Sequence, residues 1–385
     1  MLTGIVYYFA RYRRHPVELH KYEKWYLWGL LTYFIFFLFS FSINPFDSLG
    51  DTRFGNEIRF LLVIPLYLLV AKYKQGIHCL VAGSVGALII GFGFCLYELY
   101  IKGHSVFLGE YSKLFTGPVM LIYLVVVLSY FIPKLRKDTP YLWSGLIGLV
   151  LIATFSIIAA EVRAAYIGYV ILSLLFVSVY IRGWKKLATL IILLTSLSVM
   201  SIYSSAINSR MTIAYDELTN YLSMQDHTDP KNNAAGSSVG VRLEMWRSTP
   251  LFIKDNPLFG VGNGNYQKSV VKYIKQGKVH PAAGQFYHPH NVFIGAVIDK
   301  GLLGLAATLF VCFFPLYVYL KTYRINKYAA LTGILYVITM WILSMNETAP
   351  FEKSNFLATY LIYSLVIFQN HMHALKNTQK VTQSS

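Results

Sequence analysis

The sequence predicts an all-α protein that crosses a membrane many times. Of its 385 residues, 55% are hydrophobic and only 14% are charged, whereas soluble domains carry about 25% charged residues. The mean hydropathy is +0.48. The apolar residues are gathered into runs of about 15–20, the length of a helix that spans the hydrocarbon core of a bilayer. A polytopic membrane protein is therefore the predicted class, with ten to twelve transmembrane helices.

Ten spans follow from the apolar runs, and they divide the chain into three parts. Residues 1–203 form an N-terminal transmembrane bundle, 204–290 a large loop, and 291–385 the C-terminal transmembrane helices and tail. The opening run MLTGIVYYFA is too short to span, and no small-residue cleavage site follows it, so no cleaved signal peptide is expected. The predicted spans are 25–43, 58–71, 77–97, 114–132, 141–160, 164–181, 187–203, 291–320, 328–345 and 355–370.

The net charge of +16 is explained by topology, and no nucleic-acid partner is expected. Basic clusters fall on one side of the predicted spans, together with the C-terminal tail. By the positive-inside rule that side is cytoplasmic, so both termini lie in the cytoplasm and the large loop lies outside. The basic clusters are Arg11/Arg13/Arg14, Lys21/Lys24, Lys72/Lys74, Lys134/Arg136/Lys137, Arg182/Lys185/Lys186 and Lys321/Arg324/Lys327.

The three cysteines offer neither a disulfide framework nor a metal site. Cys79, Cys95 and Cys312 all fall inside apolar runs, without the spacing of metal ligands. We expect them to be buried in helix packing.

The outer loop, residues 204–290, contains no spanning run but several local signals. Residues 226–238 are rich in turn formers and are expected to be mobile. Residues 241–257 predict a short amphipathic helix with a proline break. The stretch GVGNGN (260–265) is a glycine-rich turn, because the dinucleotide fingerprint is incomplete and no βαβ unit surrounds it.

Residues 266–278, YQKSVVKYIKQGK, alternate lysine with apolar residues at helical spacing. Two interpretations remain open. The apolar face packs on the membrane surface with the lysines among anionic headgroups, or the segment is a solvated basic helix.

The candidate chemistry begins at His288-Pro289-His290-Asn291. Proline stops a helix that arrives from the N-terminal side, and Asn291 is a plausible N-cap for the helix that follows. The apolar run from Asn291 to Leu320 would be roughly 45 Å long as a helix, which exceeds a hydrocarbon core of about 30 Å. Its first turns, up to Asp299-Lys300, are therefore expected to protrude into the headgroup zone, with His290 at the level of the lipid phosphates.

Two arginines are expected to join this histidine on the outer side. Arg163 falls at the tip of a predicted hairpin between two spans, two residues after Glu161, and Arg242 opens the first helix of the outer loop, followed by Arg247. Arginine binds phosphate oxygens in a forked geometry. A histidine among cations stays neutral and can act as a base near pH 7.

Each of these residues also has a purely structural interpretation. A lone hairpin arginine can snorkel to the interface, Arg242 can be a surface charge, and the histidines can simply cap the helix. His288 and His290 could hold a metal, but no third ligand and no H-E-x-x-H motif accompany them. We therefore predict no metal and no cofactor.

Three segments together resemble the O-antigen ligase/polymerase family of bacterial membrane proteins. They are EVRAAY around Arg163, VGVRLEMWRSTPLFIKDNPLFGVGNGNY, and HPHNVFIGAVIDKGLLGL. Their order and spacing match the family over about residues 150–310, whereas the N-terminal spans match only as generic hydrophobic helices. The sequence EVRAAY departs from the family's frequent S-R-G or T-R-A but leaves Arg163 aligned.

The resemblance implies a GT-C-type glycosyltransferase in the bacterial inner membrane, with its site facing the periplasm. The donor would be O-antigen on undecaprenyl diphosphate and the acceptor a sugar hydroxyl of lipid A–core. In the family the H-x-H-N histidine, here His290, is essential, and Arg163 and Arg242 occupy the positions of essential arginines. His288, Asn291, Arg247 and Glu161 are further substrate-binding candidates, and Glu161 and Glu244 could orient the catalytic groups.

The implied chemistry is a metal-independent displacement with inversion. The arginines would stabilise the departing diphosphate, and His290 would take the proton of the attacking hydroxyl. An O-antigen polymerase and a protein O-oligosaccharyltransferase share the donor and remain alternatives; the short chain and modest loop favour the ligase. A lipid-linked glycan transporter is the alternative of another class, but transporter charges lie near the bilayer midplane, whereas these map to the outer boundary.

Overall fold

The structure is a computed structural model of the whole chain. It describes residues 18–45, 50–72, 76–109, 113–135, 139–181, 183, 186, 205–346, 351 and 353–384. The described residues form helices, turns and loops, with no strand among them, which confirms the predicted all-α class.

Each predicted span except 187–203, which lies outside the described residues, coincides with a long helix. Six helices of the described chain are long and apolar enough to cross a membrane. The long helices are α2 (Lys21–Ile43), α3 (Gly50–Val70), α4 (Gly76–Leu96), α5 (Lys113–Phe131), α6 (Pro140–Ala159), α7 (Arg163–Tyr180), α13 (Val292–Lys321), α14 (Lys327–Asn346) and α16 (Ser354–Ser384). A π-helical turn, η1 (Tyr97–Ile101), extends α4, and a 3₁₀ turn, η2 (Ile132–Lys134), follows α5.

The second predicted span proved too short. Helix α3 begins at Gly50, eight residues before the predicted start at 58, and has 21 residues. The first turns were missed because they carry polar residues, but Asn56 and Glu57 are buried. Glu57 pairs with Lys300 at 2.7 Å, so protein partners compensate for the charge.

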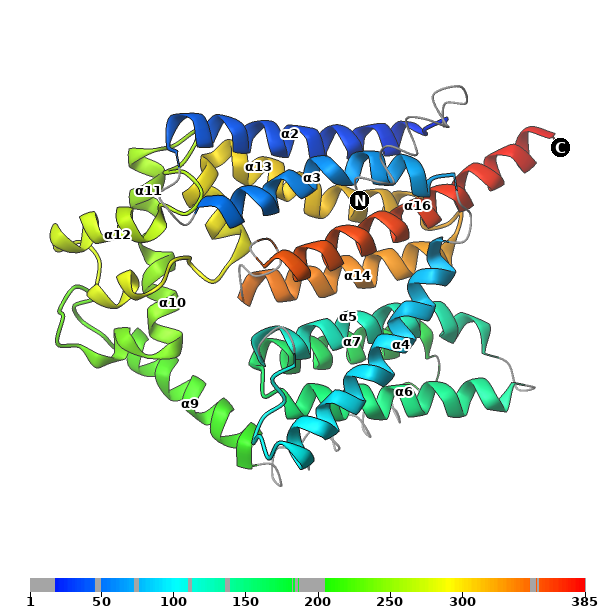
Figure 1. Cartoon of the computed structure of the whole chain (residues 1–385), viewed down its shortest axis with the longest axis horizontal. Helices are drawn as coiled ribbons and strands as arrows, with labels where there is room; N and C mark the ends of the chain where they lie inside the picture. Colours follow the sequence, from blue (N-terminus) through cyan, green and yellow to red (C-terminus); the bar gives the residue numbers. More distant parts are fainter. Residues whose placement is uncertain are drawn as a thin grey trace.

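The helices pack in two groups that α14 and α16 join (Figure 1). In the first group, α13 packs on α2 and α14, and α16 packs on α3 and α14. In the second group, α5 packs on α4, α6 and α7. Helix α14 also contacts α5 and α7, and α16 contacts α4. A salt bridge from Lys376 to Glu23 joins the start of α2 to the end of α16, so both lie at the same end of the bundle.

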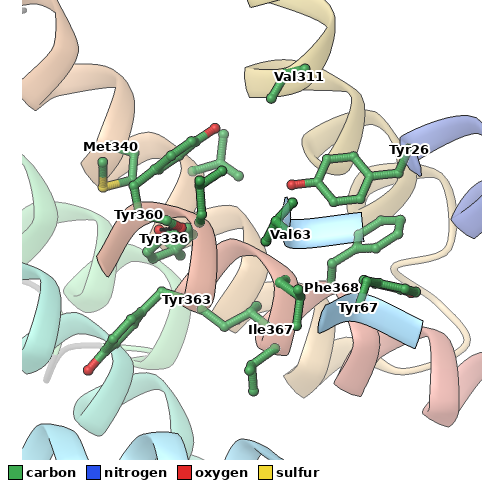
Figure 2. Close-up of a cluster of buried hydrophobic side chains, with 14 of the residues drawn as sticks. Tyr26, Val63, Tyr67, Val311, Tyr336, Met340, Tyr360, Tyr363, Ile367 and Phe368 are labelled. Carbon is green, nitrogen blue, oxygen red and sulfur yellow. Dashed lines mark hydrogen bonds between the residues drawn. The ribbon is translucent and has the colours of Figure 1, made fainter. Parts of the chain in front are cut away.

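The core of the first group is rich in buried aromatic rings (Figure 2). Several of their hydroxyls are hydrogen-bonded. The Tyr26 hydroxyl lies 3.0 Å from Ser364 Oγ, and Tyr336 donates to the Tyr360 carbonyl at 2.9 Å. Because lipid offers no hydrogen-bond partner, a buried hydroxyl must find one within the protein. These bonds let tyrosine supply aromatic packing area inside a membrane bundle.

The cysteines are free, as expected, but only Cys95 is fully buried. Cys312 is half-buried and Cys79 is exposed on α4, so the prediction that all three are buried is wrong for Cys79.

Residues 205–290 form a domain at one end of the bundle, drawn in green and yellow in Figure 1. We call this the outer domain, and the end of the bundle that carries it the outer end. The domain has its own hydrophobic core, which includes Met245, Phe252, Tyr266 and Val270. Its elements are α9 (Ser205–Leu222), η3 (Asn233–Gly236), α10 (Ser238–Arg247), α11 (Thr249–Asp255), α12 (Tyr266–Lys275) and η4 (Pro281–Gln285).

Two predictions for this domain can be compared with the structure. The proline break within 241–257 is confirmed, because α10 ends and α11 begins at Ser248, with Pro250 in the first turn of α11. Helix α12 is also confirmed, but its apolar residues Tyr266, Val270 and Tyr273 are buried in the domain core. The interpretation in which that face packs on the membrane is therefore wrong.

Helix α13 is interrupted, which corrects the prediction of one continuous helix protruding from the bilayer. Gly301 has φ 68° and ψ −168°, far from helical values. Asp299 and Lys300, expected in the headgroup zone, are only 6% and 5% exposed. They lie inside the protein because the loop after α11 packs against the break.

The loop after α11 replaces the hydrogen bonds that the break removes. In a continuous helix the amides of residues 302 and 303 would donate to the carbonyls of 298 and 299. Here Leu302 N donates to the Pro257 carbonyl at 2.8 Å, and Leu303 N donates to the Leu258 carbonyl at 3.4 Å. In return, Val261 N and Gly262 N donate to the carbonyls of Ile298 and Asp299, at 2.8 and 3.0 Å.

Candidate active site at the outer end of the bundle

His290 lies in a strained backbone conformation immediately before α13. Its φ is +53°, a left-handed value that is uncommon for residues other than glycine. Asn291 then caps the helix, as predicted, because its side-chain oxygen accepts from the amides of Phe293 and Ile294 at 2.9 and 3.1 Å. Asn291 Nδ2 donates to the Met345 carbonyl at 3.2 Å. The cap therefore fixes the start of α13 against the end of α14.

The imidazole of His290 packs against two other rings. Its centroid lies 4.4 Å from that of His288 and 5.0 Å from that of Phe286, both in edge-to-face arrangements. His290 is 9% exposed, so its ring retains only limited access to solvent. The two histidines that the sequence singled out are thus neighbours in one cluster.

Helix α10 brings Arg242 to the same region. Trp246 Nε1 donates to the Pro289 carbonyl at 2.8 Å, so this face of α10 contacts the residue before His290. Arg242 is four residues earlier and lies on the same face of the helix. Arg242 is half-buried. Its position therefore fits a cation beside the His290 loop.

Glu244, on the other side of α10, holds the outer domain together. The carboxylate is fully buried and accepts from the Tyr221 hydroxyl at 2.9 Å, from Arg247 Nε at 2.9 Å and from His280 N at 3.0 Å. Burial acts to raise the pKa of Glu244, but the hydrogen bonds from Arg247, the His280 amide and Tyr221 outweigh it, and the pKa is lowered. Hydrogen bonding to Glu244 in turn raises the pKa of Arg247. Arg247 thus has a structural partner already, besides a contact with the Lys278 carbonyl.

Arg163 is the first residue of α7, and Glu161 forms the turn before it, with φ +52°. A Cβ built at Gly168 of α7 would lie 3.7 Å from Ile342 Cγ2 of α14. Arg163 precedes Gly168 by five residues, about 7.5 Å of helix. Helix α7 runs from the outer end inward, and α14 runs toward the outer end. The backbone of Arg163 therefore lies near the level of Met345, three residues after Ile342. The Met345 carbonyl accepts the hydrogen bond from Asn291.

The structure therefore places the elements that carry the predicted residues at one end of the bundle. One face of α10 contacts the 286–291 segment, and the start of α7 lies at the same end of the bundle. Trp246, Phe286 and Met345 were missed, because only tertiary contacts show that they support His290 and Asn291. Among the described residues, no three His, Cys, Asp or Glu side chains gather as a metal site requires.

The bundle and this site indicate a multi-pass, all-α membrane protein that carries the histidine, arginine and asparagine candidates at one end of its helices. Residues 147–309 match the model of a protein family described as O-antigen ligase. The matched range runs from α6 into α13 and includes every candidate site residue. It confirms the family resemblance for this part of the chain, and the family covers both ligases and polymerases.

A protein from Haemophilus influenzae is similar to this chain over most of its length. The two chains are 24% identical over 349 residues, which is 87% of this chain and 83% of that protein, described as uncharacterized.

Proposed function

We propose that the protein is an O-antigen ligase. It transfers O-polysaccharide from undecaprenyl diphosphate to a sugar hydroxyl of lipid A–core, at the periplasmic face of the bacterial inner membrane. The observation that carries the proposal is that the Arg242 face of α10 contacts the strained His290 segment, within the range that matches the family and that also contains the Arg163 turn.

The reaction is a single displacement at the anomeric carbon. His290 accepts the proton of the acceptor hydroxyl, whose oxygen forms the new bond to the anomeric carbon as the bond to the diphosphate breaks. The electron pair leaves with the undecaprenyl diphosphate, and the guanidinium groups of Arg163 and Arg242 stabilise that charge. One displacement inverts the configuration.

Two groups would orient these reactants. His288, which packs edge-to-face on His290, limits rotation of the imidazole and lines the approach of the hydroxyl. Glu161, in the turn beside Arg163, orients the guanidinium or a sugar hydroxyl. Asn291 would hold α13 against α14 through the Met345 carbonyl, and Arg247 would hold α10 against the turn after α12 through the Lys278 carbonyl.

The test uses purified protein with the two lipid substrates. His290→Ala should fold normally and lose transfer. His290→Asn is the sharper variant, because asparagine tolerates left-handed φ values and so separates loss of the imidazole from backbone strain. Near-normal transfer by His290→Asn would refute the base assignment, and loss of wild-type transfer on chelation would refute the metal-independent mechanism.

Deletion of the gene separates the ligase from its alternatives. A ligase deletion leaves lipid A–core without O-polysaccharide while long lipid-linked polymer accumulates. A single repeat unit on the core would instead identify an O-antigen polymerase, and loss of glycan from a protein would identify an O-oligosaccharyltransferase. Movement of the lipid-linked glycan across the vesicle membrane, without glycan transfer to an acceptor, would identify a transporter.

A further inference from the structure

Helix α12 and the turn after it expose a row of lysines that the reaction itself does not use. Lys268, Lys272, Lys275 and Lys278 are all exposed. The first three recur at spacings of four and three residues, which places them on one side of the helix. We call these four residues the basic face.

Few negative charges oppose the basic face. Between residues 248 and 291 the sole acidic residue is Asp255, whose carboxylate accepts from the Tyr273 hydroxyl at 2.8 Å. Within the part of the chain that the structure describes, no salt bridge joins Lys272, Lys275 or Lys278 to a carboxylate. Apart from Asp255, the acidic residues of the outer domain that are not buried lie on α9 and in the 226–229 turn: Asp216, Glu217, Asp226 and Asp229.

The basic face belongs to the same packed unit as the candidate active site. Tyr266 on α12 donates to the Ala283 carbonyl at 3.2 Å, and Gln267 Nε2 donates to the Gly284 carbonyl at 2.8 Å. The chain then runs directly from η4 to Phe286 and His290. A molecule whose hydroxyl reaches His290 therefore extends toward α12 if it runs outward from the bundle (Figure 1).

We propose that the basic face binds the phosphate groups of an anionic glycolipid acceptor while the acceptor hydroxyl reaches His290. This inference rests on the proposed function. A bilayer surface fits the face less well, because the apolar side of α12 is already buried in the domain core. In addition, α12 lies at the end of the outer domain away from the helix bundle (Figure 1).

The experiment compares two forms of one acceptor, purified lipid A–core with its phosphates intact and the same glycolipid after chemical dephosphorylation. Lys272→Gln/Lys275→Gln/Lys278→Gln removes three charges of the basic face. Lys24→Gln/Lys321→Gln/Arg324→Gln removes three exposed charges at the opposite end of the molecule and is the matched control. Acceptor binding without donor and the acceptor KM for transfer are both measured, in neutral and in anionic nanodiscs.

The basic-face variant should bind the phosphorylated acceptor about tenfold more weakly, the size expected from three exposed charge contacts. Its kcat at saturating acceptor should be unchanged, and it should match wild type on the dephosphorylated acceptor. Added salt should weaken binding to wild type more than to the variant. The control variant should behave as wild type.

Equal binding of the phosphorylated acceptor by wild type and the basic-face variant would overturn the inference. So would an effect that follows the anionic lipid content of the nanodisc and ignores the acceptor phosphates, which would assign the face to the membrane. If wild type binds the phosphorylated acceptor but transfers no glycan to either form, the proposed function fails while the binding result still decides the inference.

Discussion

Backbone strain and candidate chemistry coincide at the level of single residues. Within the described residues, the non-glycine residues with positive φ are Glu161 and His290. Such conformations cost of order 1–3 kcal/mol and persist only where surrounding contacts enforce them. At His290 the Asn291 cap fixes the following residues, and the Trp246 bond fixes the preceding carbonyl. The strained backbone therefore sets the direction of the His290 imidazole.

Trp246 is therefore expected to position His290. Trp246→Phe keeps an aromatic ring but removes the donor to the Pro289 carbonyl. We expect kcat for glycan transfer to fall about 10- to 100-fold, since small misplacements of a catalytic group have large effects, while the KM for each substrate changes little. Steady-state kinetics with both substrates measure this split.

The matched control is Trp143→Phe, an exposed tryptophan on α6, which should leave kcat unchanged. If Trp246→Phe raises KM with kcat intact, Trp246 contributes to substrate binding and does not position the base.

Glu244 should make the outer domain sensitive to acid. Its folded pKa lies below the ordinary value of 4.5, so its ionised form stabilises the fold. That contribution is complete above 4.5 and is lost as the pH falls through the folded pKa. Glu244→Gln should lower the free energy of unfolding by about 2–4 kcal/mol at neutral pH, because it leaves buried donors and Arg247 without a charged acceptor.

Thermal unfolding from neutral pH to below 4.5 tests both statements. Wild type should lose stability at the acid end more steeply than Glu244→Gln. Parallel pH profiles for the two proteins would show that Glu244 does not cause the loss of stability in acid.

At the scale of elements, the interrupted α13 joins the outer domain to the bundle. The break at Gly301 exchanges hydrogen bonds with residues 257–262, and Asn263 Nδ2 donates at 2.9 Å to Glu57, the partner of Lys300. Irregular backbone near membrane depth is tolerated when protein surrounds it. The loop 257–262 therefore anchors the first part of α13, the helix that begins just after His290.

Gly301→Ala should weaken this joint. Alanine would be strained at φ 68°, and its Cβ would collide with the backbone of Leu258. The expected cost is about 2–4 kcal/mol from strain and contact together, with proteolysis of the outer domain becoming faster. Gly83→Ala on α4, where a Cβ meets nothing within 4 Å, is the matched control and should be neutral or slightly stabilising. Equal effects of the two substitutions would contradict the role of the break.

The same elements show what sequence can and cannot predict. Apolar runs and the Asn291 cap are local signals, so the helices and the start of α13 followed from them. The break at Gly301 did not, because a glycine in an apolar run looks like any other until residues 257–262 supply the missing partners. The apolar face of α12 was likewise ambiguous, since periodicity shows that a face is buried but not whether lipid or protein covers it. For the site, the sequence indicated the candidate residue types. The roles of Trp246 and of the hydrogen bonds around Glu244 did not follow from it, because they depend on contacts between distant segments.

At the scale of the whole molecule, the proposal requires that the outer domain faces away from the cytoplasm. The structure places the start of α2 and the end of α16 at one end of the bundle, joined by Glu23 and Lys376, and the candidate site at the other. Lys24, Lys321 and Arg324, which belong to the basic clusters of the sequence, lie at the end away from the site, which the positive-inside rule assigns to the cytoplasm. A donor built on a lipid diphosphate could reach His290 from the periplasm only in this orientation.

Cysteine labelling decides the orientation. In a background with Cys79, Cys95 and Cys312 replaced by alanine, single cysteines are placed at the exposed positions Lys275 and Arg324. Intact spheroplasts are treated with a membrane-impermeant maleimide. Lys275→Cys should be labelled at once, and Arg324→Cys only after the membrane is permeabilised. The reverse pattern would place Arg242 and His290 in the cytoplasm, where neither periplasmic glycan transfer nor the proposed acceptor contact at α12 could take place.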